Sequence, residues 1–347
     1  MRRVTLGQTG IEVSTLCLGS MTWGTQNTAE EGHAQIGRAL ERGVDFIDSA
    51  EMYPVNPVSA ETQGRSEEII GEWCAKSGRR GEVVLATKIS GGGRAHIRGG
   101  RGFAPGDVAG AVEDSLRRLR TDYIDLYQLH WPNRGSYMFR RNWSYDPSGQ
   151  NRAETLQHME DMLGALAREA EKGRIRAFGL SNESAWGTAQ WLAAAERTGG
   201  PRVASIQNEY SLLCRLYDTD LAELGVNEEV TLLAFSPLAV GLLTGKYQDG
   251  AVPEGSRRSI VPELGGRVTE RVFPAVAAYL DIAARHGLDP AQMALAWVLT
   301  RPFPAIPIFG ATKTDHLERA LGAADLVLSA EVLAEIGAAH KAHPMPY

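Results

Sequence analysis

The chain has 347 residues, of which 43% are hydrophobic and 22% charged, a composition typical of a globular protein with a sizeable core. A formal net charge of −6 argues against nucleic acid or an anionic membrane as a partner. The three cysteines show neither CxxC nor Cys/His spacing, so we expect reduced thiols and no metal site. The N-terminus lacks an apolar signal segment, and the most apolar run, at 230–243, is too short to span a bilayer, which favours the cytoplasm.

Short apolar segments rich in strand-favouring residues alternate with longer amphipathic stretches along the chain. Several of these segments are continuously apolar, as is typical of parallel strands buried on both faces. The eight segments lie at 13–19, 44–48, 82–89, 123–130, 175–181, 203–208, 230–236 and 305–311.

The stretches between these segments carry helix signals. Residues 28–43 begin with Thr28 and Glu31 in capping-box spacing and end at a glycine. Residues 154–173 also end at a glycine, and residues 289–299 have proline at an early helical position. Eight strand–helix units in a chain of this length predict an α/β fold, a closed (β/α)8 TIM barrel formed by residues 1–347 as one domain.

Three additions to the barrel are expected. Residues 3–13 predict a β-hairpin with Thr9-Gly10 in its turn, placed to close the barrel floor. A long loop without helical periodicity, 131–153, follows the fourth strand and would lie over the active site, since loops of this length are commonly functional. An extra helix is expected near the C-terminus.

Chemistry-bearing side chains stand at successive strand ends. The second strand ends in Asp48, the third in Lys88 and the fourth in His130, and Tyr53 follows in the loop after the second strand. Because the active site of such a barrel lies at the carboxyl ends of its strands, these four groups should converge. Each of them alone is more often a helix cap, a turn former or a solvated side chain, and only their combination indicates a catalytic site.

The combination favours proton transfer by the phenol of Tyr53. The pKa of a free tyrosine is about 10, too high for efficient acid catalysis at neutral pH. An ammonium about 4 Å away, at an effective dielectric near 20, stabilises a phenolate by roughly 4 kcal/mol, or roughly 3 pKa units if nothing opposes it. Asp48 would hold Lys88 charged and cancel part of this effect, and His130 would hydrogen-bond the substrate oxygen. A carbonyl protonated in this way must receive hydride on carbon, which implies a nicotinamide.

These residues lie in motifs that resemble the aldo-keto reductase family. The resemblance extends from residue 3 to about residue 340. Within the family, AEMYPV and HWP are most similar to the bacterial Tas-type branch, which is related to the potassium-channel β-subunits. The motifs are IDSAEMY (47–53), ATK (86–88), LYQLHWP (126–132), FGLSNE (178–183), IQNEYSLL (206–213), AFSPLAVGLLTGKY (234–247) and GATKTDHLERA (310–320).

The resemblance implies an NADP(H)-dependent enzyme that reduces aldehydes or ketones, with Tyr53 as proton donor. It implies that the fifth and sixth strand ends bind the nicotinamide carboxamide and that an aromatic residue of the seventh stacks on the ring. The turn after the seventh strand would bind the pyrophosphate with Lys246, and Arg257 would lie near the 2′-phosphate. The full set of implied cofactor contacts is Ser20, Met21, Ser181, Asn182, Gln207, Phe235, Ser236, Pro237, Leu238, Val240, Lys246, Arg257, Gly310, Thr312, His316 and Arg319.

The adenine end departs from the family pattern G-A-S/T-x-x-x-Q-L-x-x-N. His316 replaces the glutamine and Ala320 the asparagine, so the amide that would read adenine is missing. Lys313, His316 and Arg319 add basic groups, which favours NADP(H) over NAD(H) because positive charge attracts a 2′-phosphate. No GxGxxG is present, as expected of a family that binds its dinucleotide without a Rossmann fold, and the segment 241–247 has too few residues between its glycines for a Walker A loop.

The expected substrate wall includes Trp23, Trp131 and four aromatic residues of the long loop, which favours aromatic or apolar carbonyl compounds. Two other functions stay open: an NADP(H)-binding regulatory or redox-sensing subunit with slow turnover, and a Schiff-base aldolase with Lys88 as nucleophile. No oligomeric state is predicted. Three arginines of the long loop either attract an anionic group or belong to the solvated surface: Arg134, Arg140 and Arg141.

Overall fold

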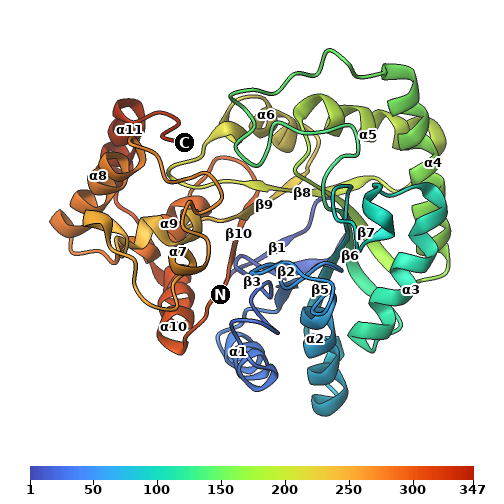
Figure 1. The fold of residues 1–347 in the computed structure, drawn as a ribbon, viewed down its shortest axis with the longest axis horizontal. Helices are drawn as coiled ribbons and strands as arrows, with labels where there is room; N and C mark the ends of the chain where they lie inside the picture. Colours follow the sequence, from blue (N-terminus) through green and yellow to red (C-terminus); the bar gives the residue numbers. More distant parts are fainter.

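Eight parallel strands close into a barrel at the centre of the computed structural model, which describes residues 1–347 (Figure 1). The strands pair in the order β10-β3-β4-β5-β6-β7-β8-β9, so neighbours along the chain are neighbours in the barrel. Every strand falls in a predicted segment, with β8 one residue longer, and the predicted TIM barrel is confirmed. The strands are β3 (Cys17–Gly19), β4 (Phe46–Asp48), β5 (Val84–Ile89), β6 (Ile124–Leu129), β7 (Ile175–Ser181), β8 (Val203–Glu209), β9 (Thr231–Phe235) and β10 (Ala305–Phe309).

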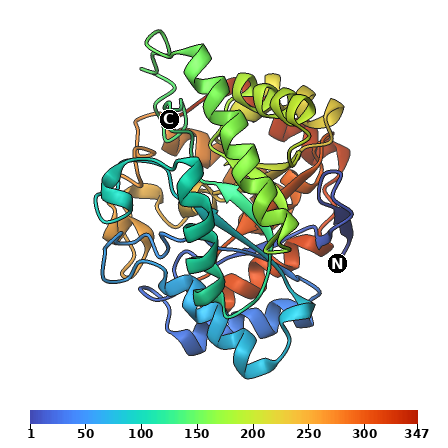
Figure 2. The ribbon, with the colours of Figure 1, turned by 90° about the vertical axis from the view of Figure 1, so that its right-hand side faces the viewer.

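Helices surround the barrel, and Figure 2 shows α3 and α4 side by side along its wall. The predicted capping box at the start of α1 is present: the Thr28 hydroxyl accepts a bond from the Glu31 amide, and the Glu31 side chain accepts one from the Thr28 amide. Beyond the barrel helices, α8 and α11 pack against each other, and α11 is the expected additional C-terminal helix. The helices are α1 (Ala29–Glu41), α2 (Arg65–Ser77), α3 (Val108–Leu119), α4 (Arg152–Glu171), α5 (Ala185–Thr198), α6 (Asp220–Asn227), α7 (Arg257–Ile260), α8 (Val272–Arg285), α9 (Pro290–Leu299), α10 (Thr314–Gly322) and α11 (Ala330–Ala342).

The predicted hairpin closes the floor of the barrel. Strands β1 (Arg3–Thr5) and β2 (Glu12–Ser14) pair antiparallel, and Thr9 and Gly10 lie in the turn between them. Leu6 and Ile11 of the turn join one buried cluster with residues that line the barrel interior, such as Phe46. The amide of Gly7 donates a 3.0 Å hydrogen bond to the Thr231 hydroxyl at the start of β9. The amino end of the barrel is therefore filled by the hairpin, and only the carboxyl end is left for a ligand.

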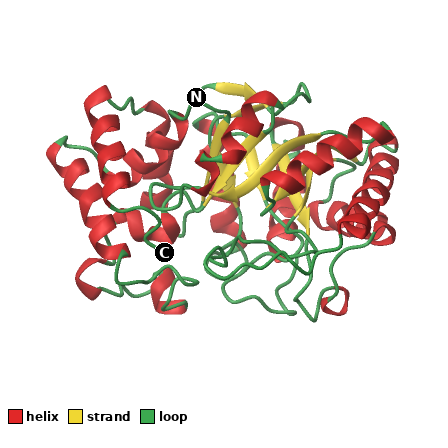
Figure 3. Cartoon of the chain, turned by 90° about the horizontal axis from the view of Figure 1, so that it is seen from above, coloured by secondary structure: helices red, strands yellow, loops and turns green.

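The loops that follow the strands gather at the carboxyl end, opposite the hairpin (Figure 3). The long loop between β6 and α4 forms no helix or strand, as predicted. A second, larger apolar core lies between the barrel and its helices. The cysteines are free thiols: Cys17 and Cys74 are buried and Cys214 is half-buried. No helix has the length and apolar character that crossing a membrane requires.

Substitution of Gly7 should weaken the floor of the barrel. Gly7 has a φ of +53°, and a Cβ atom there would stand 2.6 Å from the backbone oxygen of Ala204. We expect Gly7→Ala to lower the free energy of unfolding by about 2–4 kcal/mol, because backbone strain and a steric clash add. Gly10→Ala is the matched control, since Gly10 also has positive φ (+71°) but has free space around it, and should cost only about 1 kcal/mol. Equal losses in urea titrations of the two variants would contradict the assigned packing.

Candidate active site

The four predicted catalytic residues meet at the carboxyl end of the barrel. The Lys88 ammonium donates hydrogen bonds of 2.6 Å to Asp48 Oδ2 and to the backbone oxygen of Ser49. Its Nζ atom lies 4.8 Å from the centre of the Tyr53 ring. The rings of Tyr53 and His130 meet edge to face with centroids 5.8 Å apart. All four side chains are buried, so the acid, the amine, the phenol and the imidazole form one desolvated group.

Hydrogen bonds to its carboxylate and to its backbone oxygen fix the position of Asp48. Its Oδ1 atom accepts hydrogen bonds from Gln207 Nε2 (2.9 Å) and Gln128 Nε2 (3.2 Å). Its backbone oxygen accepts bonds from the amide (3.0 Å) and hydroxyl (2.9 Å) of Ser20. Ser20 and Gln207, expected to contact the cofactor, thus direct these donor groups to Asp48. The sequence did not lead us to predict Gln128 as a site residue, although a polar side chain inside the apolar strand LYQL was a usable signal.

Burial controls the protonation of the site. It opposes the charge of Lys88, but Asp48 and Tyr53 outweigh it and raise the pKa of the ammonium. Burial also raises the pKa of Tyr53 above 10, because it exceeds the lowering by Lys88 and because Asp48 adds to it. The sequence-based expectation of a lowered tyrosine pKa is therefore wrong for this structure. The pKa of His130 is well below its usual value, owing to burial, Lys88 and Arg94, so the imidazole is neutral, and its Nδ1 atom has no hydrogen-bond partner.

The ends of β7 and β8 carry the predicted carboxamide-binding residues. Ser181 Oγ donates to the Gln207 backbone oxygen at 2.8 Å. Asn182 adopts a positive φ of 54°, and its Nδ2 atom donates to the backbone oxygen of His130 (2.9 Å) and to Ser181 Oγ (3.0 Å). Its Oδ1 atom is buried without a hydrogen-bond partner. A buried acceptor without a donor is costly, and an N–H group of a ligand would satisfy it.

The turn after β9 has an unusual backbone. Phe235 lies half-exposed at the strand end, and the turn continues through Ser236, Pro237 and Leu238. Positive φ values occur at Ser236 (51°), Ala239 (46°), Val240 (52°) and Gly241 (98°). Backbone conformations of this kind form concave nests of amides that bind anions. Glycine is favoured at position 241, because its φ of +98° lies in a region that side-chain-bearing residues rarely adopt.

Positive charges without acidic partners lie beside this turn. Burial, Lys313 and Arg257 lower the pKa of Lys246. Burial and Arg267 lower the pKa of Arg257 to about 10, and Arg257 donates only to Asn56 Oδ1 (3.1 Å) and to Met21 Sδ (3.9 Å). Groups that repel one another when charged gain stability when an anion binds between them.

The predicted adenine-end residues lie on the adjoining rim. His316 Nδ1 is 3.5 Å from the hydroxyl of Thr312, and its pKa is lowered by burial and by Lys246, Lys313 and Arg319, while Asp315 raises it. Arg319 differs from the expectation, because its Nε atom pairs with Asp289 at 3.2 Å and its charge is partly neutralised. Gly310 leaves the rim open, with only the backbone oxygen of Gly19 within 4 Å of its Cβ position.

Of the two predicted substrate-wall tryptophans, one faces the site. The ring of Trp131 packs 4.8 Å from the ring of His130, and its Nε1 atom donates to the Gly92 oxygen at 3.1 Å. Trp23 is fully buried in the core, where its Nε1 atom donates to Gln35 Oε1 of α1 at 3.0 Å. The expectation for Trp23 is therefore corrected, because its side chain supports the first helix and is closed to ligands.

The long loop is fixed across the rim by its arginines. Arg134 pairs with Glu183 after β7. Arg140 donates to Glu209 at the end of β8 (2.9 Å), and the same carboxylate accepts bonds from Arg267 (2.8 Å) and the Tyr347 hydroxyl (3.2 Å). The charges of Arg134 and Arg140 are thus neutralised by buried acids. These two arginines hold the loop in place and are not free to attract a substrate anion.

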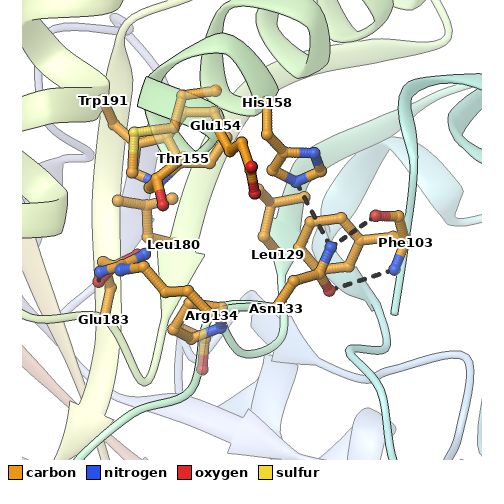
Figure 4. Close-up of a pocket in the computed structure, with 13 residues that line it drawn as sticks. Phe103, Leu129, Asn133, Arg134, Glu154, Thr155, His158, Leu180, Glu183 and Trp191 are labelled. Atoms are coloured by element: carbon orange, nitrogen blue, oxygen red, sulfur yellow. Dashed lines mark hydrogen bonds and ion pairs between the residues drawn. The ribbon is translucent and has the colours of Figure 1, made fainter. Parts of the chain in front are cut away.

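A cavity lies beside the predicted site, on the side of the long loop that faces α4 and α5. It has a volume of about 260 Å³ and lies between the long loop, the first turns of α4 and the helix α5 (Figure 4). Ser181 is its only lining residue among the predicted site residues, and none of the catalytic four borders it. The cavity is therefore distinct from the active site. Its lining is Phe103, Leu129, Pro132, Asn133, Arg134, Glu154, Thr155, His158, Met159, Leu180, Ser181, Glu183 and Trp191.

Comparison with known proteins confirms the resemblance seen in the sequence. A family model described as "Aldo/keto reductase family" matches residues 15–341. "Protein tas" of Escherichia coli (strain K12) is 45% identical over 340 residues, covering 97% of this chain and 96% of that protein. "Aldo-keto reductase YhdN" of Bacillus subtilis (strain 168) is 30% identical, with coverages of 92% and 87%. A "Probable voltage-gated potassium channel subunit beta" of Arabidopsis thaliana is 30% identical, with coverages of 94% and 92%.

Removal of the Glu209 charge should destabilise the protein and release the long loop. Glu209→Gln leaves Arg267 buried without a counterion, which we expect to cost about 3–5 kcal/mol of unfolding free energy. Amide hydrogen exchange should accelerate in residues 136–145 and 263–267. The control is Glu82→Gln, which breaks a solvent-exposed pair with Arg79 and should leave stability unchanged within error. Unaltered exchange in the loop would show that Glu209 does not hold it.

Proposed function

The chain belongs to the aldo/keto reductase family, and on that premise we propose that it is an NADP(H)-dependent enzyme that reduces aldehydes or ketones to alcohols. The observation that carries the proposal is the buried contact of Lys88 with both Asp48 and Tyr53, beside a neutral His130. A phenol, an ammonium and an imidazole at one desolvated point provide a proton, a positive charge and a hydrogen bond for a carbonyl oxygen.

Residues around this point fit a nicotinamide dinucleotide. The bound cofactor would supply the hydride that reduces the carbonyl carbon. The unsatisfied Asn182 Oδ1 suits the N–H of a carboxamide, and the half-exposed Phe235 at the end of β9 suits stacking on the nicotinamide ring. The turn of Ser236 to Gly241 with Lys246 suits a pyrophosphate.

The positions of the basic residues suggest which of them bind the pyrophosphate and which bind the 2′-phosphate. The charge of Arg257 influences the pKa of Tyr53, so Arg257 lies toward the nicotinamide end and suits the pyrophosphate better than the distant 2′-phosphate. Lys313 and His316, close to Lys246 on the outer rim, suit the 2′-phosphate. Because Lys246 and Lys313 form no ion pair with an acid, the site should prefer NADP(H) to NAD(H).

The pKa of Tyr53 is compatible with its role as an acid. Below this pKa the phenol keeps its proton, so it is ready to donate when a substrate binds. Once the carbonyl carbon accepts hydride, the oxygen becomes an alkoxide, which is a stronger base than a phenolate and takes the proton. The Lys88 ammonium then stabilises the phenolate, Asp48 keeps Lys88 charged, and solvent restores the proton. His130 donates a hydrogen bond to the same oxygen.

The two other functions are less well supported. A Schiff-base aldolase needs a neutral lysine, whereas the raised pKa of Lys88 keeps it protonated. A regulatory subunit is suggested by the names of plant relatives described as probable potassium channel subunits. Tight NADPH binding without measurable turnover would favour that function over the reductase.

Tyr53→Phe should abolish reduction while the cofactor still binds. We expect the rate of NADPH oxidation with benzaldehyde to fall at least about 100-fold, since the general acid is lost, and NADPH fluorescence titrations to be unchanged. The wild-type reduction rate should stay level through neutral pH and fall only in strongly alkaline solution, because burial raises the pKa of Tyr53 above the usual tyrosine value of about 10. Oxidation of the alcohol needs the phenolate, so its rate should rise with pH. A variant that retains turnover would overturn the assignment of Tyr53.

Lys313→Gln should weaken binding of NADPH more than binding of NADH. Loss of a charge-assisted contact to the 2′-phosphate should raise the Kd for NADPH about tenfold and leave the Kd for NADH unchanged. Arg319→Gln is the control and should have a smaller effect, because Asp289 already neutralises Arg319. Equal changes for both cofactors would place the 2′-phosphate elsewhere.

A further inference from the structure

The segment 90–103, SGGGRAHIRGGRGF, forms a glycine-rich loop directly after the strand that carries Lys88. The loop is anchored at its base. The Gly93 amide donates to the Gly100 oxygen at 2.8 Å, and Arg98 bonds to both Glu51 (2.7 Å) and the Ser90 oxygen (2.6 Å). Its conformation is therefore set by internal bonds and by a buried carboxylate, and Arg94 to His96 form the tip.

This glycine-rich loop is one wall of the active site. Ile97 is buried and packs in one cluster with Met52 and Tyr53, and Trp131 packs against the same cluster. The Trp131 indole donates to Gly92, and a Cβ atom at Gly91 would stand 2.1 Å from its nitrogen. The glycines thus let the loop backbone lie directly on the aromatic wall beside the catalytic phenol and imidazole.

Arg94 at the tip of the loop has no partner. Its side chain is exposed and makes no hydrogen bond, ion pair or aromatic contact. Its backbone oxygen accepts a 2.9 Å hydrogen bond from the amide of Ile97, which packs in one cluster with Tyr53, so Arg94 lies at the edge of the site, and its charge lowers the pKa of His130. Four other arginines of this loop and of the long loop are neutralised by carboxylates: Arg98 by Glu51, Arg101 by Asp107, Arg134 by Glu183 and Arg140 by Glu209.

We propose that Arg94 binds a carboxylate of the substrate, so that the preferred substrates are aldehydes or ketones that carry this anionic group. The inference rests on the proposed reductase function. A guanidinium with all its donors free can hold a carboxylate with two parallel hydrogen bonds. The carbonyl end of the same molecule would lie at Tyr53 and His130, with Trp131 and Ile97 against its apolar middle.

The test compares each of the three carboxybenzaldehyde isomers with its methyl ester, using NADPH oxidation by the full chain. We expect the wild type to favour at least one acid over its ester by about tenfold or more in kcat/KM, mainly through KM, and the preference to shrink in high salt. In Arg94→Gln the ratio should fall toward one, and in Arg94→Glu it should invert. Arg101→Gln is the control: it removes a paired arginine of the same loop and should preserve the ratio.

The outcomes distinguish failure of the carboxylate site from failure of the proposed reductase function. Efficient reduction of the esters without any preference for an acid, or a preference that survives Arg94→Glu, overturns the carboxylate site and leaves the reductase intact. If the wild type binds NADPH but turns over none of the acids or esters, both the carboxylate site and the reductase function are overturned.

Discussion

The ion pair of Lys88 with Asp48 is the interaction on which the rest of the site depends. An ammonium with no solvent exposure is stable only if its charge is matched and its donors are satisfied. Asp48 and the Ser49 oxygen meet these needs, and Gln128 and Gln207 complete the hydrogen bonding of the carboxylate. Because the pair joins the ends of two adjacent strands, the barrel itself fixes the positive charge beside Tyr53.

Most other charges near the mouth are matched as well, and the exceptions are informative. Glu51, Glu183 and Glu209 each accept an arginine from a loop, so these acids set the shape of the rim. Lys246 and Arg257 have no acid and lie where phosphates are expected, and Arg94 has none beside the imidazole. A chain with net charge −6 therefore presents unpaired positive charge at its mouth, which attracts anions toward the site.

The barrel could be predicted because short apolar segments, several of them continuously apolar, alternate with amphipathic stretches, and the catalytic group because parallel strand ends meet at one rim. What could not be predicted depends on partners distant in sequence. Arg134 and Arg140 were ambiguous because their acids lie 49 and 69 residues away. Trp23 gave no local sign that its indole would bond to α1. The direction of the Tyr53 pKa was misjudged because a Coulomb estimate from one neighbour omits burial, which is a property of the whole fold.

Burial determines when Tyr53 can release its proton in the proposed reaction. In the resting site it raises the pKa of the phenol and so holds the proton on it. In the proposed reaction the proton would move to the nascent alkoxide, and the phenolate would then lie beside the Lys88 ammonium in the same water-poor environment, where the attraction between the two is stronger than in water. The site therefore disfavours a phenolate at rest, and in the proposed reaction the proton leaves Tyr53 only as the more basic alkoxide forms. Catalysis needs this difference between the ground state and the transition state, and a merely lowered pKa would not supply it.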